Sequence, residues 1–284
     1  MSPVRGNRTH VDQSEGTHMT VNEADSVTHL AESRGATIAY RSMGVGEPAL
    51  MFIHGICADR SYFRSQFLHF SQRRRVLALD LRGHGASSPA DEASIEELAA
   101  DVIAVADDAG VQRVVLCGHS MGGPIALRAA SARPDLVRGI AMLDGVVLFP
   151  EPVRAAALGR LVPALATEHW KQALRGFFDT NILEPQDPPD LRHRVMASAD
   201  DVSPALVRAI FTSLFSSDHS DELRRSTSRL LYIHGKTPAD VQRLQVLRPD
   251  AAVERIRGRG HYLMLTAPER VNSMLGSFLE QAAN

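Results

Sequence analysis

The sequence is short of several features that would each indicate a class of protein. Its only two cysteines, Cys57 and Cys117, exclude a disulfide framework and suit a reducing compartment. No run of about eighteen apolar residues is present, so no segment is expected to span a membrane. Basic and acidic residues number 31 and 33, which leaves no excess of positive charge to bind nucleic acid.

Signs of bound groups and of repeated units are missing as well. The chain has no metal-ligand spacing, no glycine-rich dinucleotide fingerprint and no internal repeat, so we expect neither a metal nor a cofactor. Residues 1–25 are polar and lack the apolar stretch of a secretory signal. We interpret them as a disordered extension and expect a cytoplasmic location. Nothing in the sequence indicates the oligomeric state.

What is present is an alternation of short apolar runs with amphipathic helical stretches. Each run holds only a few residues and little polar alternation, as expected of strands buried on both faces of a parallel sheet. The runs are 37–40, 50–53, 76–79, 114–117, 140–143, 230–233 and 253–256. The order predicts an α/β fold with a mostly parallel sheet flanked by helices.

Two helices carry the signature of a capping box at their beginning. Ser94 and Glu97 have the required spacing ahead of an apolar stripe that stops at Gly110. Thr266 and Glu269 repeat the spacing near the C-terminus, which predicts that the last helix begins there.

The strand pattern is interrupted between about residues 146 and 226. Seven of the 15 prolines lie in this part of the chain, with helical stretches between them. We interpret 146–226 as a helical cap inserted into a core formed by 26–145 and 227–284. Its aromatic side chains form either the cap's own core or an apolar roof over a pocket, and we favour the roof. They are Phe149, Trp170, Phe177, Phe178, Phe211 and Phe215.

The strongest chemical signal is Gly118-His119-Ser120-Met121-Gly122, directly after the run 114–117. A tight turn from strand to helix raises one side chain above the sheet edge and requires small neighbours. The Ser120 hydroxyl then lies at a helix N-terminus, where unpaired N–H groups favour developing negative charge. Ser120 is therefore the candidate nucleophile.

A serine needs a base to take its proton, and His261 is the best of twelve histidines. It follows the run 253–256, so it is expected at the same carboxyl edge of the sheet as Ser120. His54, His84 and His119 lie in glycine-flanked loops near this edge, where they are more suited to holding loop geometry. His54 and His119 nevertheless remain candidates for the substrate pocket.

An acyl-transfer site also needs two N–H donors for the oxyanion. The run 50–53 leads into His54-Gly55-Ile56-Cys57. We expect the backbone N–H groups of Ile56 and of Met121, which follows the nucleophile, to supply them. Cys57 is placed at the candidate pocket, as a small packed residue rather than a reactive thiol.

Together these motifs resemble the α/β-hydrolase superfamily over nearly everything from about residue 27 onward. The motifs are His54-Gly55, the loop 80–87, the turn around Ser120 and Gly-x-Gly-His at His261. The resemblance implies that Ser120 is the nucleophile, His261 the base, and Ile56 and Met121 the oxyanion hole. The motifs are specific to the fold but not to the substrate.

The catalytic acid departs from the pattern of most members. Their acid follows the strand that here ends at His234-Gly235, where this sequence has Pro238 at the expected spacing. The next carboxylate, Asp240, fits the first turn of a helix capped by Thr237. The alternative is Asp144 after the run 140–143, since some haloalkane dehalogenases and zearalenone-type lactonases take their acid from this strand. We favour Asp144 over Asp240, with Asp80 a distant third.

The leading interpretation is a serine hydrolase that cleaves carboxylic esters or lactones through an acyl-enzyme. Two alternatives stay open: a cofactor-independent ring-cleaving dioxygenase, which the stretch 54–57 also resembles, and a ligand receptor without turnover. The aromatic side chains of the cap suggest an apolar small-molecule substrate bound near Trp170, Phe177 and Phe178. Its identity is not encoded in any motif.

Overall fold

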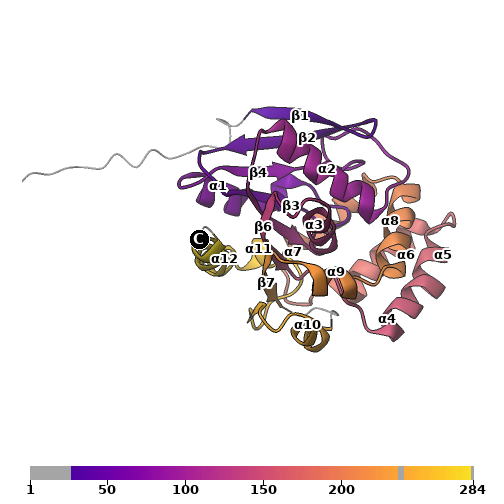
Figure 1. The fold of residues 1–284 in the computed structure, drawn as a ribbon. Helices are drawn as coiled ribbons and strands as arrows, with labels where there is room; N and C mark the ends of the chain where they lie inside the picture. The colour runs from indigo at the N-terminus through magenta and orange to yellow at the C-terminus, as the bar shows by residue number, and fades with distance from the viewer. Residues whose placement is uncertain (1–26, 236–239, 283–284) are drawn as a thin grey trace, which may run out of the picture.

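The computed structural model describes residues 27–235 and 240–282, with an eight-stranded sheet at its centre (Figure 1). The strand order is β1-β2-β4-β3-β5-β6-β7-β8. The neighbours from β4 to β8 in this order are parallel, whereas β1 and β2 are antiparallel at one edge. The strands are β1 (Thr28–Ser33), β2 (Ala36–Met43), β3 (Ala49–Ile53), β4 (Val76–Leu79), β5 (Val114–His119), β6 (Val137–Leu143), β7 (Arg229–His234) and β8 (Ala252–Arg255). The predicted mostly parallel sheet is confirmed, and every predicted run overlaps one of its strands.

Burial along the strands explains which of them could be found in the sequence. All residues of β3, β4 and β5 are buried, as two covered faces require. Only Ala31 and Ser33 of β1 are buried, because this strand pairs with β2 alone at the edge of the sheet. β1 was not predicted, since its mostly polar composition resembles that of a loop.

Helices cover both faces of the sheet. On one face α2 (Ile95–Asp108) packs against α3 (Gly122–Ala132), and α9 (Ser220–Arg225) packs against α3 and against α10 (Val241–Leu247). On the other face lie the short 3-10 helix η2 (Arg60–Phe63), α1 (Arg64–Ser71), α11 (Leu263–Thr266) and α12 (Pro268–Ala282).

Of the two predicted capping boxes, one is confirmed and one is wrong. The Ser94 hydroxyl accepts from the Glu97 N–H at 3.2 Å, and the Glu97 carboxylate accepts from the Ser94 N–H at 2.9 Å. Thr266 is instead the last residue of α11, where its hydroxyl donates to the Tyr262 carbonyl at 3.1 Å. Because α12 begins at Pro268, Ala267 and not Thr266 directly precedes it.

The segment that connects β6 to β7 in the sequence forms a group of helices. In space these helices lie beside the carboxyl ends of the strands (Figure 1). We call residues 151–216 the helical insertion. It contains α4 (Glu151–Ala156), the π-helical segment η3 (Ala157–Leu161), α5 (Val162–Ala164), α6 (Trp170–Phe177), the π-helical segment η4 (Phe178–Ile182), α7 (Pro189–Asp200) and α8 (Pro204–Ser216). The cap boundaries predicted at 146 and 226 remain a prediction.

Two sequence-based predictions fall on parts of the chain that the structure does not describe. The expected extension, residues 1–25, and Thr237, the expected cap of α10, both lie outside the described residues. Within residues 27–235 and 240–282, no helix combines the length and the apolar composition that crossing a bilayer requires.

Candidate active site

The turn that carries Ser120 joins β5 to α3 at the centre of the sheet. β5 ends at His119 and α3 begins at Gly122. Ser120 has a φ of 52°, in the left-handed region that non-glycine residues rarely adopt. Its N–H donates to the Leu143 carbonyl at 3.1 Å, which ties the turn to the end of β6. Strain of this kind persists where the surrounding structure enforces it, and it gathers at functional sites.

The glycines around Ser120 are required by close contacts. A Cβ atom on Gly118 would lie 2.1 Å from the carbonyl oxygen of Gly122. A Cβ atom on Gly122 would lie 2.4 Å from the carbonyl oxygen of Ile53. Both distances are far below van der Waals contact, so any larger residue would displace β3 or α3. This agrees with the small neighbours that the sequence pattern demands.

Asp144 and His261 meet beside this turn. Asp144 follows the last residue of β6, and its carboxylate Oδ2 lies 2.8 Å from Nδ1 of His261. The other oxygen, Oδ1, accepts from the Gly235 N–H at 2.9 Å. Asp144 is fully buried and His261 is 4% exposed. A buried carboxylate held at both oxygens fixes the orientation of the imidazole that faces it.

Asp240 lies elsewhere and has a different partner. It is the N-cap residue of α10, and its carboxylate accepts from the Arg243 N–H at 2.9 Å. It therefore occupies the cap itself, not the first helical turn as predicted. Asp80, the third candidate, accepts from the N–H groups of Arg60 and Ala86. Of the three candidate acids, the structure brings only Asp144 to His261.

Ser120 and His261 line one cavity of about 110 Å³, together with Ile56, His119 and Met121. Aromatic side chains of the helical insertion and the segment before it cover this cavity: Phe149, Phe177, Phe178, Phe211 and Phe215. The apolar roof expected from the sequence is therefore present. In the described part of the chain, no hydrogen bond joins the Ser120 hydroxyl to the His261 ring. Such bonds are often long without substrate and shorten when it binds.

Two residues that line this cavity have backbone N–H groups without a partner among the described residues. Within residues 27–235 and 240–282, no protein acceptor is hydrogen-bonded to the N–H of Ile56 or of Met121. Both residues line the cavity and both are largely buried. Buried N–H groups are nearly always paired, so two free ones beside a serine are available for a ligand oxygen.

His119 supports the segment that carries His261. Its Nε2–H donates to the His261 backbone carbonyl at 3.1 Å, and the two ring centroids lie 4.6 Å apart. Burial lowers the pKa of His119 well below its ordinary value, so the ring is neutral. The donor role of Nε2 leaves Nδ1 as an acceptor, and this atom is buried without a partner in the described residues.

His54 and His84 fasten the loops behind the cavity and do not line it. The His54 ring donates from Nδ1 to the Gly55 carbonyl and accepts at Nε2 from the Leu81 N–H. The His84 ring donates to the Arg82 carbonyl and accepts from the Cys57 N–H. Every ring nitrogen is thus used by the backbone. The prediction of His54 as a pocket residue is corrected for this reason.

Because the fold buries these two histidines, we expect its stability to decrease in acid. Burial lowers the pKa of His54 to about 4 and that of His84 to about 3, from an ordinary value of 6.5. Below pH 6.5 these two histidines become protonated in the unfolded chain but stay neutral in the folded chain. The free energy of unfolding therefore decreases as the pH is lowered, by about 1.4 kcal/mol per pH unit for each histidine. We expect His84→Gln to reduce the pH dependence of the unfolding free energy between about pH 6 and 4.5 by about 1.4 kcal/mol per pH unit, measured by urea denaturation.

His69→Gln, at an exposed position of α1, is the control and should keep the full pH dependence. An unchanged slope in His84→Gln would contradict the assignment.

Two further residues predicted for the pocket do not line the cavity. Cys57 is 3% exposed, and burial raises the pKa of its thiol to about 12, so it is a packed, protonated side chain. Trp170 begins α6 and lines a separate surface depression with Leu165 and Pro204. Trp170 lies about 10 Å along the helix from Phe177, so it lines this depression and not the inner cavity.

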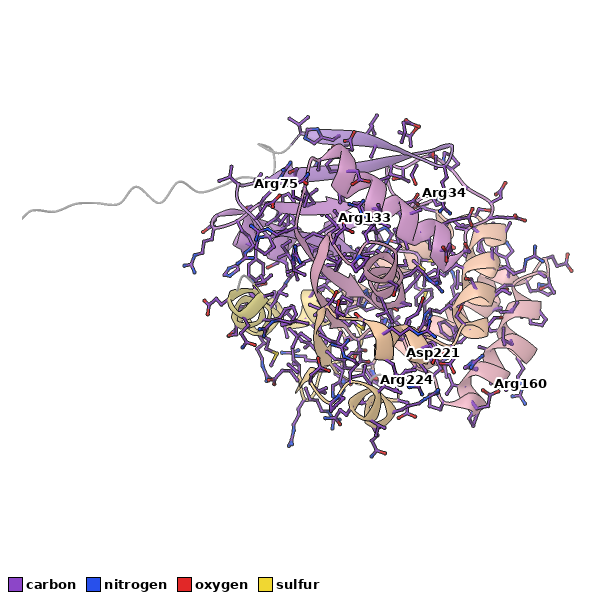
Figure 2. All side chains as sticks on the ribbon, viewed as in Figure 1. Arg34, Arg75, Arg133, Arg160, Asp221 and Arg224 are labelled. Carbon is purple, nitrogen blue, oxygen red and sulfur yellow. The ribbon has the colours of Figure 1, made fainter. Side chains whose placement is uncertain are left out.

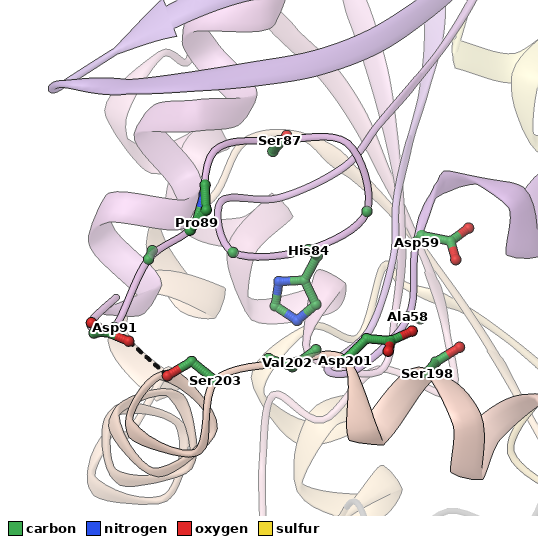
Figure 3. Close-up of a pocket in the computed structure, with 13 residues that line it drawn as sticks. Ala58, Asp59, His84, Ser87, Pro89, Asp91, Ser198, Asp201, Val202 and Ser203 are labelled. Carbon is green, nitrogen blue, oxygen red and sulfur yellow. Dashed lines mark hydrogen bonds between the residues drawn. The ribbon is translucent and has the colours of Figure 1, made fainter.

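A second cavity of about 450 Å³ lies between the helical insertion and the core loops (Figure 3). Its polar lining includes Asp59, Asp91 and Asp201, and the Ser203 hydroxyl donates to Asp91 at 2.7 Å across the seam. His84 borders this cavity, but both of its ring nitrogens are occupied by backbone groups. Among the described residues that line it, His84 is the only histidine, so no imidazole with a free nitrogen stands beside a serine there.

The sequence did not identify several residues of the inner cavity. Val146, Val153, Asn181, Ile182, Leu214 and Tyr262 line it as well. Asn181 follows Phe177 by four residues, which places both on one face of a helical segment and was a usable signal. The others carry no feature that separates them from core residues.

Comparison with known proteins assigns the family. A sequence model described as the alpha/beta hydrolase family matches residues 50–274. The chain is 27% identical over 262 residues to (E)-2-((N-methylformamido)methylene)succinate hydrolase of Acinetobacter baylyi, covering 88% of this chain and 97% of that protein.

Solved structures agree with this assignment. A thermophilic esterase from Thermogutta terrifontis superposes with a TM-score of 0.79 at 20% identity, covering 92% of this chain and all of that one (100%). Est816, described as an N-acyl homoserine lactone degrading enzyme, gives 0.74 at 25% identity, covering 88% and 100%. Because the family's sequence model spans most of the chain, the chain belongs to the alpha/beta hydrolase family.

Proposed function

We propose that the protein is a serine hydrolase that cleaves carboxylic esters or lactones through an acyl-enzyme. The observation that carries the proposal is the Asp144–His261 contact of 2.8 Å beside a cavity that Ser120 also lines. Similarity to an esterase and to a lactone-degrading enzyme supports the substrate class. The cytoplasmic location stays a prediction.

The proposed first half-reaction begins with His261. Its Nδ1–H donates to Asp144, which leaves the lone pair of Nε2 to accept the Ser120 proton. Ser120 Oγ attacks the substrate carbonyl carbon, and the oxyanion accepts from the N–H groups of Ile56 and Met121. The carbon–oxygen bond of the ester then breaks, and His261 returns the proton to the leaving alkoxide. In a lactone the alkoxide stays attached to the acyl group.

The second half-reaction releases Ser120. A water molecule gives a proton to His261 Nε2 and attacks the acyl carbon, and the acid product leaves as the proton returns to Ser120 Oγ. The helical insertion acts as a cap in this proposal, because its phenylalanines exclude bulk water from a site that otherwise holds few polar groups.

Labelling with a fluorophosphonate tests the proposal. The probe forms a stable bond only with an activated serine, so we expect one adduct per chain. Trypsin should release it on residues 114–128, where Ser120 is the only hydroxyl-bearing residue. Denatured protein is the control and should stay unlabelled. A folded protein that takes no label, or takes it on another peptide, would remove Ser120 from the proposed role.

A further inference from the structure

An apolar groove in the helical insertion adjoins the inner cavity. It has a volume of about 550 Å³ and lies between the α4–η3–α5 arm and the α6–η4 arm. Four residues line both spaces: Val153, Phe177, Asn181 and Phe215. The groove and the cavity that holds Ser120 are therefore separated by one layer of side chains.

The inner cavity is small in comparison. Its volume of about 110 Å³ is less than the roughly 150 Å³ that holds a benzene molecule in an engineered protein cavity. A substrate larger than a short acyl group must therefore extend beyond it. The four shared residues mark the direction in which the nearest apolar space lies.

The lining of the groove favours an aliphatic chain. Small side chains (Ala156, Ala157, Ala164 and Ala173) form much of its wall. Among the described residues that line it, Arg160 is the only charged one, and Figure 2 places it at the outer edge of the insertion. A wall that is mostly apolar, with its one charged side chain at the outer edge, gains free energy from burying methylene groups and offers few partners to a polar chain.

Two π-helical segments border the groove, one on each arm. η3 contributes Ala157, Arg160 and Leu161, and η4 contributes Thr180 and Asn181. A π-helical turn is rare and frequently marks a functional site. Two of them facing one groove are a second, independent sign that its shape is used.

We propose that this groove holds the aliphatic chain of an acyl substrate whose carbonyl group lies at Ser120. The inference rests on the proposed ester or lactone hydrolase activity and adds its substrate class: esters, or lactones with an alkyl side chain, of medium chain length. The acyl chain then passes beside Phe177 and Asn181, with its carbonyl group on the cavity side and its aliphatic tail on the groove side. The Asn181 side chain donates to the Phe177 carbonyl at 3.1 Å, which holds the two together.

Chain-length dependence tests this proposal. We expect kcat/KM for p-nitrophenyl esters to rise from butanoate to octanoate by about fourfold per methylene, the ratio that corresponds to ~0.8 kcal/mol for one buried CH₂. Gly176→Phe should fill the groove, because Gly176 lines it and a Cβ atom there meets no atom within 4 Å. The ratio of octanoate to acetate turnover should then fall by about tenfold or more.

Gly159→Phe is the matched control. Gly159 is also a helical glycine of the insertion with open space around its Cβ position, but it does not line the groove. Its ratio should equal that of the unaltered protein, and calorimetric binding of octanoate should survive in Gly159→Phe and vanish in Gly176→Phe. Acetate turnover with a flat chain-length profile, or equal ratios in both variants, would overturn the tail site and leave the hydrolase proposal standing. Failure to hydrolyse any ester, with no label at Ser120, would overturn both.

Discussion

Ser120→Ala is expected to lower kcat for p-nitrophenyl acetate by about 10⁴-fold or more, which is the usual effect of removing a serine nucleophile. The loss follows from the proposed mechanism, since no acyl-enzyme can form without the Ser120 oxygen. The variant should fold, because alanine keeps the small size that the crowded turn between β5 and α3 requires. Steady-state hydrolysis and a thermal melt measure the two quantities.

Ser131→Ala is the matched control for this experiment. Ser131 lies on α3, the helix that follows Ser120, and its hydroxyl only donates to the Leu127 carbonyl of the same helix. Its activity should stay within about twofold of the unaltered protein. Full activity in Ser120→Ala would refute the serine mechanism. Oxygen consumption that persists in Ser120→Ala would favour the ring-cleaving dioxygenase instead.

Asp144→Asn is expected to lower kcat by about 10⁴-fold with little change in fold. An amide at this position can donate to Nδ1, which favours the tautomer with its proton on Nε2 and removes the base. Asparagine tolerates the left-handed backbone of Asp144, whose φ is 48°. Single-turnover kinetics and the melting temperature separate the catalytic loss from a structural one.

Asp240→Asn supplies the comparison. Its carboxylate caps α10, and asparagine is an equally good N-cap, so both stability and activity should stay near normal. A damaged Asp240→Asn beside a normal Asp144→Asn would reverse the assignment of the acid.

The turn at Ser120 could be predicted from the sequence because its constraints are local. Gly118 and Gly122 stand within four residues of each other, and their close contacts with the turn and with β3 require glycine. The buried strands could also be predicted, since their apolar runs are too short for buried helices and alternate with amphipathic helical stretches. Asp144 could only be given as the favoured one of three candidates, because its contact with His261 joins segments 117 residues apart.

What the sequence could not provide depends on where residues lie along their helices and on the edges of the sheet. Trp170 and Phe177 belong to the same helix, but only Phe177 faces the cavity. The aromatic composition alone does not distinguish them. Thr266 has the spacing of a capping residue, and only the structure shows that it ends α11 and does not directly precede α12. The edge strand β1 has only two buried residues, so its sequence contains almost no apolar pattern that would predict a strand.

The left-handed backbone at Ser120 restricts how this site can evolve. A β-branched side chain is a severe outlier at a φ of 52°, so threonine would clash with its own main chain even though it brings the same hydroxyl. Under the proposed mechanism, a lineage that loses serine here therefore cannot replace it with threonine and keep the acyl-enzyme chemistry. Glycine, asparagine and aspartate are compatible with this left-handed backbone. Relatives that carry one of them here would be either inactive or catalysts of a different reaction.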